Sequence, residues 1–184
     1  MSFKRKVIVI VGMPGSGKAM ASRVAQDLGY PVLVCGDVIR EEAKRRGLPP
    51  TPENIGTLML KIREEEGRAV VASRLIPRIQ AQNSNVVVVE GARNIEEIDE
   101  LRKHYDVRTL AINASPQTRF TRLKSRGRSD DPKSKNDFIV RDQREIDVGI
   151  SKIIAAADRT IVNEGSIQEF KHSVNRLLKE MCLK

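Results

Sequence analysis

The apolar run "VIVIV" at residues 7–11 leads directly into "GMPGSGKAM" at residues 12–20, and this junction constrains the fold most strongly. An unbroken apolar run predicts a strand that is buried on both faces. Gly12, Gly17 and Lys18 satisfy the pattern G-x-x-x-x-G-K, placed between a strand and a helix. The glycines allow successive N–H groups to point at one anion, and the lysine and helix N-terminus add positive charge. The junction therefore predicts a phosphate-binding loop.

Apolar runs and amphipathic stretches alternate along the rest of the chain. Further strands are expected at 31–35, 85–90, 107–113 and 159–163. Helices are expected at 17–28, 37–46, 54–82 (with breaks at Gly67 and Pro77), 94–104, 115–126, 137–157 and 166–181. Buried strands separated by helices predict a three-layer α/β fold with a five-stranded parallel sheet. Ligands of such sheets bind at the carboxyl ends of the strands.

Composition narrows the class of partner. The chain has 184 residues, a net charge of +9 and a pI of about 9.8, which predicts one domain with an anionic partner: nucleotide, nucleic acid or both. Aromatic residues make up only 3%, which argues against recognition of bases by stacked aromatic side chains. No apolar stretch approaches the roughly 20 residues that span a bilayer, so no membrane association is expected. Cys35 and Cys182 lack metal-ligand spacing and are expected to be reduced thiols of a cytoplasmic protein.

Charged residues follow the second and third strands. Asp37 and Arg40 lie three apart at the start of a helix, hence on one face, although Asp37 also suits a helix N-cap. Glu90 ends the third strand, where a carboxylate can hold Mg²⁺ through water, and the alternative is a cap for the nearby turn. Arg93 follows it closely. These positions predict an acceptor pocket and a metal-side carboxylate beside the loop.

Basic residues are concentrated after the fourth strand. The segment from Arg119 to Arg128 contains five basic residues and no acidic one, and Arg141 follows in "IVRDQRE". Such a run is usually a solvated helix face. Its place between a strand end and a polar loop instead favours a role at phosphates, because phosphoryl transfer requires positioning and neutralisation of charge.

The residue after Lys18 is Ala19, where phosphate loops usually carry a magnesium-binding hydroxyl, and Met20 follows. Ser22 lies nearly a helical turn beyond Lys18 and is not assigned to the metal. Mg²⁺ would then be held through water or by other carboxylates. A degenerate site that binds nucleotide without catalysis is one alternative.

Several motifs resemble those of nucleotide kinases. "GMPGSGKAM", with Pro14, resembles the "GxPGxGKG" loop of adenylate kinases, whose residue after the lysine also lacks a hydroxyl. "CGDVIR" at 35–40 resembles their "TGDxxR" segment and the "D-x-x-R" of dephospho-coenzyme A kinase, and "EGAR" at 90–93 resembles "DGxPR". "RSDD" at 128–131 followed by Arg141 resembles the adenylate kinase lid. "RDQREIDVGI" at 141–150 fits an archaeal family of adenylate-kinase-like proteins, and the resemblance covers nearly the whole chain.

The resemblance implies a P-loop nucleotide kinase with core 1–36, 83–126 and 137–184, acceptor-binding helices 37–82 and a lid at 127–136. It implies ATP and Mg²⁺ as cofactors, with Glu90 on the metal side. Lys18, Arg128 and Arg141 would act on the transferring phosphoryl group, Asp37 on an acceptor hydroxyl, and Arg40 and Arg93 on an acceptor phosphate. The residues expected at the nucleotide are Gly12, Pro14, Gly15, Ser16, Gly17, Lys18, Ala19, Arg122, Arg126, Asn163 and Gly165.

Two functions of different classes follow. The first is ATP-dependent phosphoryl transfer to a nucleotide or nucleotide-like acceptor, of the nucleoside monophosphate or dephospho-coenzyme A type. The second is a nucleotide-binding or ATPase module of an RNA- or ribosome-associated assembly with little kinase activity. The sequence leaves open the identity of the acceptor, ATP against GTP, and the oligomeric state.

Overall fold

The computed structural model describes residues 4–129 and 131–183, so Asp130 of the "RSDD" segment lies outside the described residues. The centre of the fold is strand β1 (Lys6–Val11), whose residues Val7 to Val11 are completely buried. It pairs in parallel with β3 (Val86–Glu90) and β4 (Asp106–Asn113). The edges are β2 (Val32–Val34) and β5 (Arg159–Val162). In the described chain the sheet order is β2-β3-β1-β4-β5, which confirms the predicted five-stranded parallel sheet.

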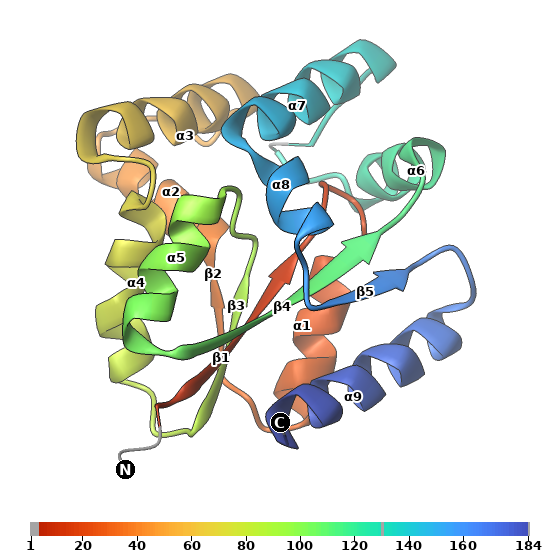
Figure 1. Cartoon of the computed structure of the whole chain (residues 1–184). Helices are drawn as coiled ribbons and strands as arrows, with labels where there is room; N and C mark the ends of the chain where they lie inside the picture. The colour runs from red at the N-terminus through yellow and green to blue at the C-terminus, as the bar shows by residue number, and fades with distance from the viewer. Residues whose placement is uncertain (1–3, 130, 184) are drawn as a thin grey trace.

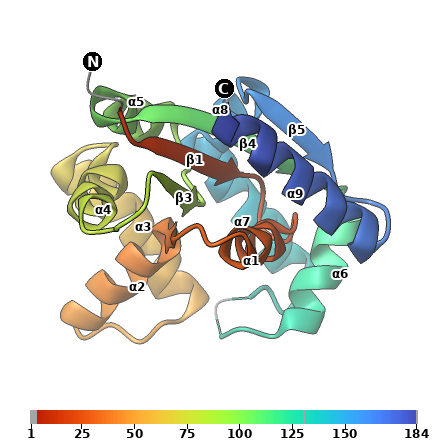
Figure 2. The same cartoon turned by 90° about the horizontal axis from the view of Figure 1, so that it is seen from below.

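Helices cover both faces of this sheet. They are α1 (Lys18–Asp27), α2 (Cys35–Arg45), α3 (Pro52–Glu66), α4 (Val70–Gln80), α5 (Ile95–His104), α6 (Pro116–Arg126), α7 (Lys135–Val148), α8 (Ile150–Ala155) and α9 (Ile167–Leu183). Helices α1 and α9 pack on one face through a core that includes Ile8, Ile10 and Leu178 (Figure 1). Helices α4, α5 and α8 cover the opposite face with Val7 and Val9, and the view from below separates the two layers (Figure 2). The three-layer prediction is confirmed.

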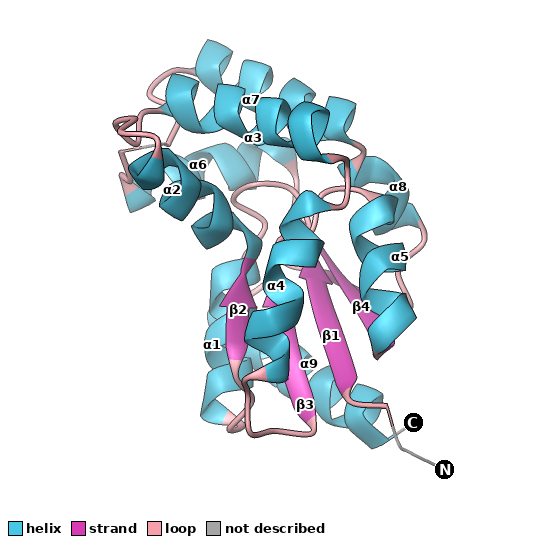
Figure 3. Cartoon of the chain, turned by 90° about the vertical axis from the view of Figure 1, so that its left-hand side faces the viewer, coloured by secondary structure: helices cyan, strands magenta, loops and turns pink. Residues whose placement is uncertain are grey.

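A second group of helices lies above the carboxyl ends of the strands. Helices α3 and α7 run close together there, with α2 and α6 nearby (Figure 3). The connection from α6 to α7 begins at Gly127, whose φ of 62° ends α6. These four helices therefore cover the carboxyl ends of the strands, where ligands of parallel sheets bind.

Three local predictions were wrong. Helix α4 continues through Pro77, because Leu75 and Ile79 on either side are buried in the core and only three residues of the helix follow the proline. The expected long helix 137–157 breaks at Gly149, whose φ of 116° favours glycine. Helix α2 begins at Cys35 with Val34 as N-cap, so Asp37 lies inside the first turn and caps nothing.

No helix in the described part of the chain combines the length and apolarity needed to cross a membrane. Both cysteines are free, with Cys35 buried and Cys182 half-buried.

Candidate active site

The phosphate loop has a backbone that only glycine tolerates. Gly12 and Gly17 have φ values of 150° and 116°. A Cβ on Gly12 would lie 2.3 Å from the carbonyl oxygen of Ile112, and one on Gly17 would lie 2.3 Å from Nδ2 of Asn163. Both the conformation and the close neighbours therefore exclude a side chain at these positions.

Two side chains of the loop, those of Lys18 and Ser16, carry the polar groups that suit a phosphate. Nζ of Lys18 donates hydrogen bonds of 2.7 Å to the Gly12 carbonyl and 3.1 Å to the Met13 carbonyl. Burial lowers the pKa of Lys18 to about 8, against the opposing influence of Glu90. Within residues 4–129 and 131–183, the buried hydroxyl of Ser16 has no hydrogen-bond partner. A phosphate would supply acceptor oxygens to both groups, so the residues present fit the phosphates of a nucleotide.

Asn163 supports the loop from behind. Its Nδ2 donates a 2.8 Å hydrogen bond to the Ser16 carbonyl, and its own carbonyl accepts a 3.0 Å bond from Arg122. Asn163 and Gly165 were expected at the nucleotide, but the described chain places neither in the lining of the main cavity. Asn163 is buried and Gly165 is exposed. The structure thus gives Asn163 a role in holding the loop.

Arg119 is buried, and the sequence placed it in the basic segment without a role of its own. Its Nη1 donates to the Pro14 carbonyl at 3.2 Å and to Oδ1 of Asp142 at 2.8 Å, and its guanidinium lies 4.9 Å from the centre of the Phe138 ring. A Cβ on Gly15 would lie 2.6 Å from the backbone carbonyl oxygen of Arg119. Arg119 therefore links the phosphate loop to α7. Nothing in a single sequence pairs it with Asp142, which is 23 residues away.

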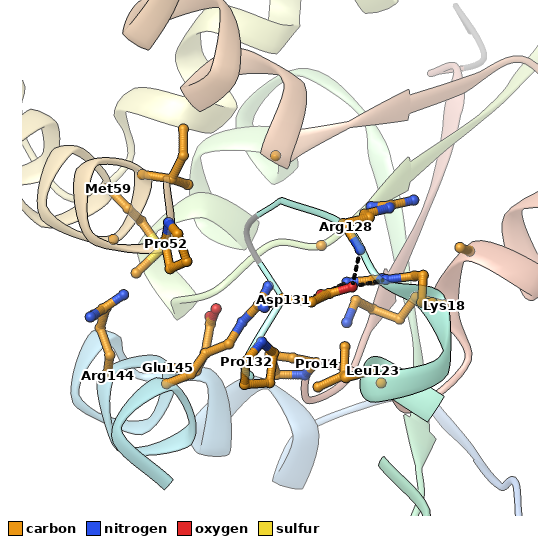
Figure 4. A pocket seen from close by; sticks show the side chains of 18 of the residues that line it. Pro14, Lys18, Pro52, Met59, Leu123, Arg128, Asp131, Pro132, Arg144 and Glu145 are labelled. Atoms are coloured by element: carbon orange, nitrogen blue, oxygen red, sulfur yellow. Dashed lines mark hydrogen bonds and ion pairs between the residues drawn. The ribbon is translucent and has the colours of Figure 1, made fainter. Parts of the chain in front are cut away.

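A cavity of about 1050 Å³ opens in front of the loop, between α2–α3 and α6–α7 (Figure 4). It contains most of the expected site residues and leaves out Gly12, Ser16 and Asp37 as well as Asn163 and Gly165. The expected residues that line it are Pro14, Gly15, Gly17, Lys18, Ala19, Arg40, Glu90, Arg93, Arg122, Arg126, Arg128 and Arg141.

Glu90, which was expected on the metal side, lines the cavity and is bonded to Ser22 of α1. The buried hydroxyl of Ser22 donates a 2.6 Å hydrogen bond to Oε2 of Glu90. No cluster of three or more metal-ligating side chains exists among the described residues. Mg²⁺ commonly keeps several waters and binds one or two carboxylates plus substrate phosphates, so Glu90 fits a water-mediated contact.

The sequence interpretation missed Glu145. Its Oε2 accepts a 2.6 Å hydrogen bond from Nε of Arg93, and its side chain is 5% exposed. Burial alone would raise the pKa of Glu145, but Arg93, Arg141 and Lys18 outweigh it and lower the pKa. A carboxylate thus stays ionised at the phosphate loop. Its position four residues after Arg141, on the same helix face, is the signal that could have revealed it.

Asp131 accepts hydrogen bonds from Arg128 and Arg141, which were expected at the transferring phosphoryl group, and from Arg126, which was expected at the nucleotide. Its carboxylate accepts bonds of 2.9 Å from Nε of Arg126, 3.3 Å from Nη1 of Arg141 and 3.0 Å from the backbone N–H of Arg128 (Figure 4). Burial would raise the pKa of Asp131, but its hydrogen bonds and the charges of Arg126 and Arg141 lower it. One buried anion therefore holds the guanidinium groups of Arg126 and Arg141 and the backbone of Arg128.

Asp37 and Arg40 are bonded to each other, but only Arg40 lies at the cavity. The Asp37 side chain is 51% exposed and accepts a 2.6 Å bond from Nη2 of Arg40. Arg40 lines the cavity, whereas Asp37 does not. The base role expected for Asp37 requires its carboxylate to leave this pair.

A glycine loop on the central strand of a parallel sheet, with arginines above it, defines a P-loop kinase-like domain. The chain belongs to the family described as AAA domain, whose model matches residues 11–138, and it is a member of the UPF0200 proteins. It is 43% identical over 177 residues to the UPF0200 protein of Hyperthermus butylicus, covering 96% of this chain and 95% of that one.

Solved structures share the fold. The TT1252 protein from Thermus thermophilus matches with a TM-score of 0.69 and 20% identity, over 96% of this chain and 98% of that chain. Shikimate kinase from Aquifex aeolicus matches with a TM-score of 0.57 and 20% identity, over the same shares of the two chains.

Proposed function

We propose that this protein is a cytoplasmic, ATP- and Mg²⁺-dependent phosphotransferase whose acceptor is a nucleotide or a nucleotide-like molecule, of the nucleoside monophosphate or dephospho-coenzyme A type. The main support for the proposal is that one continuous cavity extends from the phosphate loop to the space between α3 and α7. One cavity with a donor end and an acceptor end is what direct phosphoryl transfer requires.

The donor end is built from the loop. Gly15, Gly17 and Lys18 line the cavity, and the Ser16 hydroxyl lies unpartnered behind them in the described chain. When ATP binds, Lys18 would exchange the Gly12 carbonyl for phosphate oxygens. Mg²⁺ held on the side of Glu90 would neutralise phosphate charge when bound.

The acceptor end combines apolar and cationic walls. Ile39, Ile55 and Met59 provide an apolar surface, and Arg40 and Arg93 provide positive charge. This pairing suits a molecule with an apolar or aromatic body and an anionic group. It supports a nucleotide-like acceptor.

The reaction is an in-line displacement. The acceptor oxygen forms a bond to the γ-phosphorus while the bond from that phosphorus to the bridging oxygen breaks, and ADP leaves. Arg126, Arg128 and Arg141 would neutralise the equatorial oxygens. A phosphate acceptor enters already ionised, whereas a hydroxyl acceptor must release a proton and would make Asp37 essential.

The test is an acceptor screen. Purified protein with ATP and Mg²⁺ is given AMP, CMP, dephospho-coenzyme A or a nucleoside, and ADP is measured above the acceptor-free rate. We expect at least one phosphorylated acceptor and no product from Lys18→Ala. ADP release that never depends on an acceptor would contradict the proposal. Asp37→Asn then separates the acceptor types, because full activity on a hydroxyl would exclude its base role.

A second candidate is an ATPase module bound to RNA or a ribosome-associated assembly. It is favoured by exposed basic residues at the cavity (Arg128 and Lys133) and elsewhere on the same segment of the chain (Lys124 and Lys135). It predicts RNA binding that weakens steeply with salt, and ATP turnover that RNA stimulates. Filter-binding at several salt concentrations, with ATP turnover measured in parallel, distinguishes the two functions.

A further inference from the structure

Arg144 lines the cavity one helical turn beyond Arg141 on α7. Its side chain extends from α7 toward Pro52 and Met59 of α3 (Figure 4). Lys18 lies on the opposite side of the cavity in the same view. Arg144 is half-buried, whereas the cavity arginines Arg23 and Arg128 are exposed. The sequence patterns gave this residue no role.

Gly56 provides the space that Arg144 occupies. A Cβ on Gly56 would lie 1.7 Å from Nη1 and 2.3 Å from Cζ of Arg144. Gly56 is buried inside α3, where glycine stabilises a helix less than alanine does. The glycine lets the guanidinium lie directly against the backbone of α3.

The guanidinium of Arg144 lacks the carboxylate partner that several other cavity arginines have. Arg40, Arg93 and Arg141 each donate a hydrogen bond to a carboxylate. Among residues 4–129 and 131–183, Arg144 donates no hydrogen bond and forms no ion pair. A half-buried guanidinium that faces a cavity and is bonded to none of its carboxylates is well suited to bind a planar or tetrahedral oxyanion of a ligand.

We propose that Arg144, seated against Gly56, binds an oxyanion of the acceptor. This inference rests on the proposed function and adds a specificity residue to its acceptor end. The anion is a phosphate or a carboxylate, because the guanidinium fork binds both. Since Arg144 lies across the cavity from Lys18, it acts on acceptor binding and leaves the transferred phosphoryl group to the other arginines.

Binding is measured by calorimetry with a non-hydrolysable ATP analogue and Mg²⁺ at saturation, so that the phosphate loop is filled. The probes are AMP and dephospho-coenzyme A for phosphate, shikimate for carboxylate, and adenosine as the neutral counterpart of AMP. We expect Arg144→Ala to weaken at least one anionic probe roughly 10- to 100-fold and adenosine less than about twofold. Arg144→Lys should recover part of the loss, and the group of probes affected identifies the anion.

Two further variants define the subsite. Gly56→Ala should weaken the same probe by displacing the guanidinium, and Arg23→Ala is the matched control that removes an equal charge from the exposed rim. In turnover, Arg144→Ala should raise the acceptor KM with little change in kcat. The subsite is excluded if each probe binds Arg144→Ala and wild type within twofold, or if no anionic probe binds more tightly than adenosine. If an anionic probe binds in a way that depends on Arg144 but no acceptor increases the release of ADP, the subsite stands and only the proposed phosphotransferase function is rejected.

Discussion

The ammonium group of Lys18 donates a 2.7 Å hydrogen bond to the carbonyl oxygen of Gly12, at the start of the same phosphate loop. The lysine is thus held by its own backbone, at a site where burial disfavours its charge. A nucleotide phosphate would place full negative charge beside the Lys18 ammonium group, in place of the neutral carbonyl oxygen that it contacts in the free protein. Lys18 should therefore be protonated more fully in the ATP complex than in the free protein, and the proton uptake on binding can be measured.

ATP binding should therefore take up protons near pH 8. The pKa of Lys18 is lowered to about 8 by burial, so about half of these side chains are neutral at that pH, and bound phosphates would raise the pKa again. We expect uptake of about 0.5 proton per ATP at pH 8 and weaker ATP binding as the pH rises further. Calorimetry in two buffers of different ionisation enthalpy measures it, with Lys18→Met as control. A buffer-independent heat would contradict the shift.

The same pKa has an effect on folding with a defined sign. Between pH 8 and the ordinary value of 10.5, the unfolded chain binds more protons at Lys18 than the folded chain does. This residue's contribution therefore makes the unliganded protein more stable as the pH rises through that window. Comparison of urea unfolding of wild type and Lys18→Met across the window isolates this contribution.

Gly17→Ala should abolish tight ATP binding, whereas Gly29→Ala should not. Both glycines have positive φ, of 116° and 82°, so each substitution costs roughly 1–2 kcal/mol in backbone strain. Only at Gly17 would the new Cβ also collide with Asn163, since nothing lies within 4 Å of that position on Gly29. ATP titration and urea unfolding of both variants check this. Equal ATP affinity in the two variants would show that the contact with Asn163 is unimportant.

Asp142→Ala should destabilise the fold by about 3 kcal/mol, because it leaves the buried guanidinium of Arg119 without its anion. Asp99→Ala is the matched control: it breaks an exposed pair with Arg102 and should cost at most about 1 kcal/mol. Denaturant unfolding gives both values. A loss of similar size in the two variants would argue against a buried link between the loop and α7.

Ser22→Ala should raise the Mg²⁺ concentration needed for half-maximal ATP turnover about 3- to 10-fold, since Glu90 loses a charge-assisted hydrogen bond that orients it. Ser73→Ala is the control, because the Ser73 hydroxyl donates its 3.3 Å hydrogen bond to the carbonyl of Ala69, the N-cap of α4, and Ser73 does not line the cavity. Magnesium titrations at fixed ATP measure the effect. Superimposable curves for Ser22→Ala and wild type would separate Glu90 from the metal.

Most of the fold could be predicted because its signals are local. The strands are apolar throughout, and the Gly12–Lys18 loop joins one of them to a helix. The errors occurred where packing outweighs a local signal. Pro77 stays inside α4 because its neighbours are buried, and the carbonyl of Val148 at the end of α7 accepts a 2.6 Å bond from Arg68, a partner that periodicity along α7 does not show.

The site was predicted less completely, for a different reason. Lys18, Arg126, Arg128 and Arg141 belong to motifs with fixed spacing, and the structure gathers them at one cavity. Arg144 belongs to no such motif, because its place depends on a glycine 88 residues earlier, across the gap between α3 and α7.

The sequence alone determined the order of strands and helices, the glycine loop on the first strand and the excess of positive charge. These follow from hydrophobic periodicity, glycine conformation and charge counts, which act over a few residues. Only the tertiary structure decided which charges are neutralised. It pairs Arg119 with Asp142 and Arg93 with Glu145, and it leaves Arg144 without a partner in the described chain. Electrostatic pairing depends on distance and burial in space, so separation along the chain does not predict it.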